Sequence, residues 1–126
     1  IFIIIINFNF DKQTDDKSDS INAAISIVYD SDDSNNRDEG IRSPDNLTWA
    51  DNGMIYIQED PATRLNVFAS NGIEASVWQL DPKSLEVQRI AIINRNTILP
   101  VDAEDENTGL VGTWETSGIL DVSQYF

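Results

Sequence analysis

Short runs of β-branched and aromatic residues, separated by turn-forming residues, are the feature that most limits the folds open to this chain. The clearest pair of runs is residues 46–50 (NLTWA) and 54–58 (MIYIQ), which flank Asp51-Asn52-Gly53. Asn-Gly readily takes the positive φ that a type I′ turn requires, so this stretch predicts a β-hairpin. No stretch of the sequence shows clear helical periodicity. The pattern therefore predicts an all-β fold.

Other β-rich runs extend this prediction. They are residues 3–6, 25–29, 75–80 and 86–93, with a shorter strand expected around residues 118–120. Asp81-Pro82 favours a turn between the third and fourth of these runs, because proline presets φ. Strands joined by short turns predict an antiparallel meander of about four strands, which is one blade of a β-propeller. We therefore expect about one blade plus flanking strands of an incomplete propeller.

The N-terminal part of the sequence has a different character. Residues 1–10 are apolar, but a bilayer span needs about 20 such residues, so we expect no membrane span here. Residues 11–20 (DKQTDDKSDS) are polar and indicate a linker. We therefore treat residues 1–20 as an N-terminal extension and linker and residues 21–126 as a partial propeller. Because the sequence starts with Ile1, we expect it to be a piece of a longer protein.

Charge and composition exclude several functions. The 126 residues include 22 acidic and 8 basic side chains, a formal net charge of -14, and no Cys or His. Nucleic-acid binders that neutralise phosphates need a basic surface, so we expect no nucleic-acid partner. The Ser-His-Asp triad, HExxH chemistry and Cys-based zinc sites are excluded as well. The remaining ligand groups are mostly carboxylates, which suit hard cations such as calcium.

One acidic run, residues 30–40 (DSDDSNNRDEG), has some features of a calcium loop. An EF-hand needs Gly at position 6 and Glu at position 12, where this run has Asn35 and Ile41. It is therefore not an EF-hand. An irregular calcium loop and a solvated turn both remain open.

A second group of acids lies at one end of the predicted hairpin. Asp45 and Asn46 begin one strand, and Glu59 and Asp60 follow the next. Because neighbouring antiparallel strands begin and end at the same sheet edge, we expect these residues to lie close together. Three carboxylates in one place repel unless a metal or a cation pairs with them, and Arg42 or Arg64 could be that cation. A metal site and a set of Asx turns both remain open.

A third candidate is Glu115, which lies between Trp114 and the apolar pair Ile119-Leu120. A carboxylate at the edge of a buried strand needs a partner or a metal ion. The nearby run of residues 102–106 (DAEDE) is expected to be a solvated loop.

The segments RSPDNL (42–47), WADNG (49–53) and IYIQED (55–60) resemble the SPDN-L hairpin of the PhoX-type alkaline phosphatases. The segments NGIEASVW (71–78) and WETSGILDV (114–122) are similar to later parts of cyanobacterial-type members. The resemblance covers roughly residues 25–126. It suggests a fragment from the C-terminal region of a β-propeller phosphatase.

This resemblance implies a secreted or periplasmic enzyme that hydrolyses phosphate monoesters at a centre containing calcium and iron. It carries Glu59 and Glu115, together with Asp45 and Asp60, over as metal ligands. The family's centre also includes a cysteine, which this chain lacks, so we expect the isolated chain to be inactive. The alternative is a non-catalytic, calcium-stabilised β-propeller module that binds protein or glycan.

Overall fold

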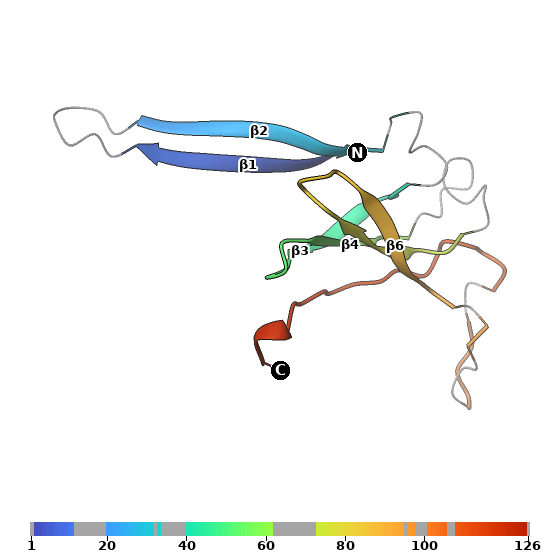
Figure 1. Ribbon diagram of the computed structural model, residues 1–126. Helices are drawn as coiled ribbons and strands as arrows, with labels where there is room; N and C mark the ends of the chain where they lie inside the picture. Colours follow the sequence, from blue (N-terminus) through green and yellow to red (C-terminus); the bar gives the residue numbers. More distant parts are fainter. Residues whose placement is uncertain are drawn as a thin grey trace.

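The computed structural model describes residues 2–11, 20–31, 33, 40–61, 73–94, 96–97, 101–105 and 108–125 (Figure 1). Within these ranges the chain forms two antiparallel sheets and one short 3₁₀ helix. The elements are β1 (Phe2–Asp11), β2 (Ser20–Asp30), β3 (Pro44–Trp49), β4 (Ile55–Glu59), β5 (Ser76–Leu80), β6 (Val87–Ile92) and η2 (Ser123–Tyr125). The predicted all-β fold is confirmed.

The larger sheet has the strand order β3-β4-β5-β6, so each strand pairs with its neighbour in sequence. This confirms the predicted antiparallel meander. Its register places Leu47, Ile57 and Trp78 opposite one another, and likewise Trp49, Ile55 and Leu80. Since side chains alternate between faces along a strand, both sets share one face, which is the apolar one.

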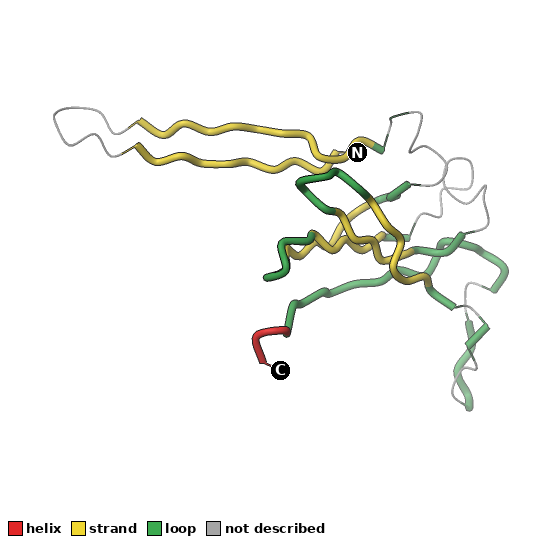
Figure 2. Tube along the Cα trace, viewed as in Figure 1, coloured by secondary structure: helices red, strands yellow, loops and turns green. Residues whose placement is uncertain are grey.

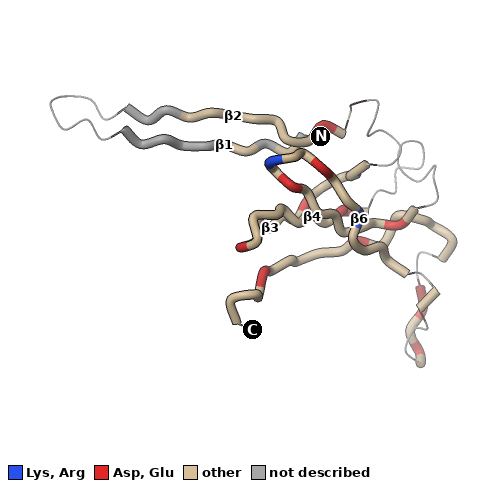
Figure 3. The backbone as a smooth tube through the Cα atoms, viewed as in Figure 1, with Lys and Arg blue, Asp and Glu red and all other residues tan. Residues whose placement is uncertain are grey.

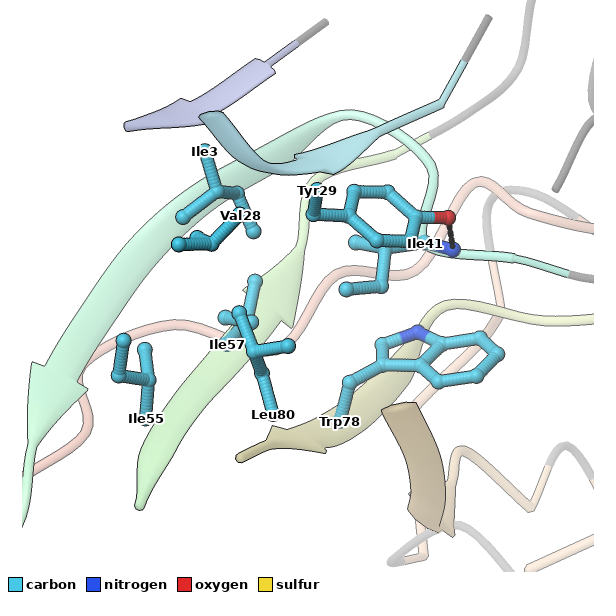
Figure 4. Close-up of a cluster of buried hydrophobic side chains, with 8 residues drawn as sticks. All are labelled: Ile3, Val28, Tyr29, Ile41, Ile55, Ile57, Trp78 and Leu80. Carbon is cyan, nitrogen blue, oxygen red and sulfur yellow. Dashed lines mark hydrogen bonds between the residues drawn. The ribbon is translucent and has the colours of Figure 1, made fainter. Parts of the chain in front are cut away.

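The smaller sheet is a ribbon of β1 and β2, and its base covers part of the apolar face (Figure 4). Ile3, Val28 and Tyr29 from the ribbon join Ile57 and the other buried residues of the sheet in one core. A register shift between Ile3 and Ile4 leaves Val28 as an extra residue in β2. This bulge explains how two consecutive side chains, Val28 and Tyr29, are both buried.

Beyond this base the ribbon projects away from the larger sheet (Figure 1). Ile25 and Ile27 are exposed on it, and Leu47 and Trp49 are exposed on the edge strand β3. A single four-stranded sheet with one small cover leaves such apolar residues uncovered.

The β3–β4 turn differs from the predicted type I′ geometry. The N–H of Gly53 donates to the carbonyl of Ala50 (2.9 Å), and Gly53 has φ of 84°. Asn52 is not among the residues of positive φ, although a type I′ turn requires it there. The turn is therefore type I followed by a left-handed glycine. The Asn52 side chain accepts the N–H of Met54 (2.9 Å), an interaction that stabilises this form.

The β5–β6 turn is organised by Asp81. Its carboxylate accepts the N–H of Lys83 (2.8 Å), and its carbonyl accepts the N–H of Leu85 (2.8 Å). The first of these bonds lowers the pKa of Asp81 below its usual value. The turn forces Leu85 to a φ of 62°, a left-handed conformation that is unfavourable for leucine.

Residues 113–122, which we call the C-terminal strap, cross the polar face of the larger sheet without regular structure (Figure 2). The strand expected around residues 118–120 is therefore wrong. Gly118 has φ of 74°, which is incompatible with an extended strand. In the parts of the chain that the structure describes, no helix is long and apolar enough to cross a membrane.

The first prediction concerns the contact between the ribbon and the sheet. The Tyr29 hydroxyl accepts the N–H of Ile41 at 2.6 Å in the core. Replacing Tyr29 with Phe leaves this buried N–H without an acceptor, and we expect a loss of about 1–3 kcal/mol in the free energy of unfolding. Urea denaturation measures the loss. The control Tyr125→Phe lies at an exposed position and should be nearly neutral.

The same side chain predicts a pH effect. Burial raises the pKa of Tyr29 above the usual value for tyrosine, about 10. The unfolded chain therefore loses this proton more easily, and stability falls as the pH rises from the unfolded pKa through the folded one. We expect the Tyr29→Phe variant to lack this component of the alkaline loss. An identical alkaline profile in the wild type and the variant would contradict the assignment.

The second prediction concerns backbone strain at Leu85. Asn tolerates positive φ better than Leu, so Leu85→Asn should raise the free energy of unfolding by about 1 kcal/mol. Leu110 is similarly exposed (48%, against 52% for Leu85) but has no positive φ. Leu110→Asn should therefore give no gain. Equal effects of the two substitutions in a thermal melt would show that strain at Leu85 is unimportant.

Candidate functional site

The candidate site is centred on Glu59, the last residue of β4, whose side chain is 0% exposed. Its Oε1 accepts the backbone N–H of Arg42 (2.6 Å), and its Oε2 accepts the backbone N–H of Ser76 (2.8 Å). One carboxylate therefore joins the segment before β3 to the first residue of β5.

Arg42 supplies the positive charge beside this carboxylate. Its Nη2 lies 3.6 Å from Glu59 Oε2, and only 3% of the residue is exposed. The same nitrogen donates to the carbonyls of Ile73 (3.0 Å) and Glu74 (3.2 Å). A buried charge costs free energy unless it is paired and hydrogen-bonded, and both charges of this ion pair meet that condition.

Glu74 extends the arrangement to the C-terminal part of the chain. Its side chain is buried, and Oε2 accepts the N–H of Gly112 at 2.6 Å. The Ser76 hydroxyl donates to the Glu74 carbonyl (3.1 Å). We call these five residues, Arg42, Glu59, Glu74, Ser76 and Gly112, the carboxylate network. It joins β4, β5, the segment before β3 and Gly112, the residue that precedes the C-terminal strap.

The structure confirms that the two acidic segments at the hairpin end lie together. Pro44 pairs with Glu59 in the register, and the N–H of Asp60 donates to the carbonyl of Ser43 (2.9 Å). The expectation that Arg42 pairs with a carboxylate here is also confirmed. Arg64, the alternative cation, lies outside the described residues.

The four predicted metal ligands have different surroundings. Glu59 is buried and Asp60 is half-buried, whereas Asp45 is exposed and accepts a hydrogen bond from the Asn46 side chain (3.2 Å). Glu115 is exposed on the C-terminal strap, not at the edge of a buried strand as the sequence suggested. The four side chains therefore do not share one environment.

The arrangement around Glu59 differs from a calcium or iron site. Among the described residues, no group of three or more acidic side chains could hold a metal ion. Both oxygens of Glu59 accept N–H groups, and a guanidinium lies where a cation would bind. These residues as arranged fit an ion pair rather than a metal centre. The metal-ligand roles of Glu59, Glu115, Asp45 and Asp60 stay predictions from the resemblance.

Sequence reasoning missed Glu74 and Ser76. The available signal was an acid between apolar residues, in Ile73-Glu74-Ala75, just before a predicted strand. The Ser76 hydroxyl is occupied by a carbonyl acceptor, and the chain has no histidine to act as a base. The arrangement therefore offers charge pairing and structural anchoring, not an activated nucleophile.

Comparisons with known proteins gave no match to a family model, a curated protein or a solved structure. The resemblance to PhoX-type phosphatases accordingly rests on the sequence segments alone.

The third prediction separates an ion pair from a metal site at Glu59. In Glu59→Gln, an NH₂ group replaces one of the two oxygens that accept N–H groups in the wild type. Arg42 also loses its counter-charge. Removing one member of a buried ion pair costs about 3–5 kcal/mol, and we expect a loss of this size in urea denaturation.

The exposed Glu115→Gln serves as a matched control and should change stability by less than about 0.5 kcal/mol. Both measurements are made with calcium and with chelator, and we expect the same values in each. Stabilisation by calcium that disappears in Glu59→Gln would contradict the ion-pair interpretation and favour the metal site.

Proposed function

We propose that this chain is a structural blade of a larger metal-dependent phosphatase, secreted or periplasmic, which hydrolyses phosphate monoesters. By itself the chain is not catalytic. One observation carries the proposal: the two halves of the phosphatase-like hairpin motif meet at one sheet end, where Pro44 pairs with Glu59 and Asp60 bonds to Ser43. Segments that are similar to the family in sequence are therefore joined in space.

The chemistry of phosphoryl transfer is compatible with a chain that supports the active site without supplying it. Catalysis of that reaction depends mainly on positioning and on cations that neutralise the phosphoryl charge. Arg42 is buried in the carboxylate network, and the described residues hold no group of acids arranged for a metal. The proposed enzyme would therefore obtain its calcium and iron ligands mainly from other parts of the protein. The role of this chain is to present a rigid sheet end to that centre.

A non-catalytic propeller module is the second candidate. The observation in its favour is that both Glu59 oxygens already accept N–H groups from the protein itself. In this alternative Glu59 has no role in a metal centre, and the blade serves only recognition of protein or glycan.

The fourth prediction distinguishes the two candidates. We expect a complete protein that contains this chain to hydrolyse p-nitrophenyl phosphate in the presence of calcium and iron, and to lose this activity in chelator. The 126-residue chain alone should give no turnover under either condition. Absence of hydrolysis by the complete protein under every metal condition would reject the phosphatase and leave the non-catalytic module.

A further inference from the structure

A cleft of about 480 Å³ lies between the β3–β4 hairpin and the C-terminal strap. Thr48 and Tyr56 line it, and both alternate along their strands with the core residues, so it lies on the sheet face opposite the core. Its volume falls within the range of small-molecule sites, which is about 300–1,000 Å³. The cleft contains no residue of the carboxylate network, so it is independent of the proposed phosphatase function.

Tyr56 provides a fixed hydrogen-bond donor in this cleft. Its hydroxyl oxygen accepts N–H groups from the side chains of Asn52 (3.0 Å) and Gln79 (3.0 Å). A phenol oxygen has two lone pairs and one hydrogen, so these two bonds leave the hydrogen to be donated to a third group. The second hydrogen of the Asn52 amide and the hydroxyl of Thr48 are further groups that can form hydrogen bonds with a ligand.

Asp121 fixes the opposite wall. Its Oδ2 accepts the N–H of Asp51 (2.8 Å), and its Oδ1 accepts the N–H (2.9 Å) and the hydroxyl (2.6 Å) of Ser123. These bonds lower the pKa of Asp121 below its usual value, so it is ionised at neutral pH. The C-terminal strap is thus attached to the hairpin turn, and the cleft is formed before any ligand arrives.

The charges of the cleft limit what it can bind. Among the residues that the structure describes, one carboxylate and no Lys or Arg line it, and the strap itself carries no basic residue (Figure 3). An anion would therefore meet an unpaired negative charge in a chain of net charge -14. A simple cation would compete with the three hydrogen bonds that Asp121 already accepts, and it would offer no acceptor to the Tyr56 and Asn52 donors. A neutral ligand that both donates and accepts hydrogen bonds is compatible with the carboxylate and with the donors of the cleft.

The apolar part of the cleft completes the pattern. Ile119 and Leu120 of the strap, together with Ala50, line it beside the polar groups. A pyranose ring offers hydroxyls that donate and accept and also an apolar C–H surface. We propose that this cleft binds a neutral carbohydrate of one or two rings, with Tyr56 and Asn52 as the main hydrogen-bonding residues.

The test is a titration of the ¹⁵N-labelled chain, followed by two-dimensional NMR. The probes are glucose, galactose, mannose, N-acetylglucosamine, maltose, cellobiose and lactose, with sodium phosphate as the anionic comparison. We expect at least one sugar to cause saturable shifts in the side-chain amide of Asn52 and in the backbone N–H groups of the residues that line the cleft, such as Thr48 and Ile119. Phosphate should cause none there.

Variants make the assignment specific. Tyr56→Phe removes the donor, and we expect about tenfold weaker sugar binding, the effect of losing one hydrogen bond. Tyr125→Phe removes a phenol hydroxyl from an exposed tyrosine of η2 that does not line the cleft. This control variant should bind sugar like the wild type. Thr48→Val provides a second test if Tyr56→Phe disturbs the spectrum away from the cleft. No saturable shift with any sugar, unchanged affinity in both cleft variants, or tighter binding of phosphate would each overturn the proposal.

Discussion

The buried carboxylate of Glu59 is the interaction on which the rest of the structure depends. An ionised group with no exposed surface is tolerated only when protein groups replace the water that it loses. Here two backbone N–H groups and the Arg42 guanidinium do so, and they belong to segments far apart in sequence. The need to satisfy one charge therefore fixes where β5 begins relative to β4 and how the chain enters β3.

The chain has few basic residues, and one of them is buried in this ion pair. With 8 basic against 22 acidic residues, each cation is scarce, and Arg42 is placed inside rather than on the surface. Arg89 is half-buried and contacts an aromatic ring, since its guanidinium carbon lies 4.4 Å from the ring centre of Trp78. The outer surface is left strongly negative, which opposes association through exposed apolar residues such as Leu47 and Trp49.

The sequence predicted local features better than distant ones. The four strands of the meander were predictable because alternation and turn residues act over a few positions. Antiparallel geometry and the repulsion among nearby acids indicated Arg42 or Arg64 as a partner for these carboxylates, and the structure shows Arg42 beside Glu59. The roles of Glu74 and Gly112 were not predictable, because their contact spans 38 positions and no local pattern encodes it. The strand expected near Gly118 failed because apolar residues on the strap favoured it, whereas the glycine backbone adopts a positive φ.

The charge of Arg42 also limits metal coordination by Glu59. A divalent cation and the Arg42 guanidinium would have to share one carboxylate in a buried, weakly screened environment. Their mutual repulsion disfavours simultaneous binding, so a metal at Glu59 requires Arg42 to move away. That movement would also break its bonds to the carbonyls of Ile73 and Glu74. Since Glu74 holds Gly112, metal binding at Glu59 would be coupled to the C-terminal strap rather than confined to the sheet end.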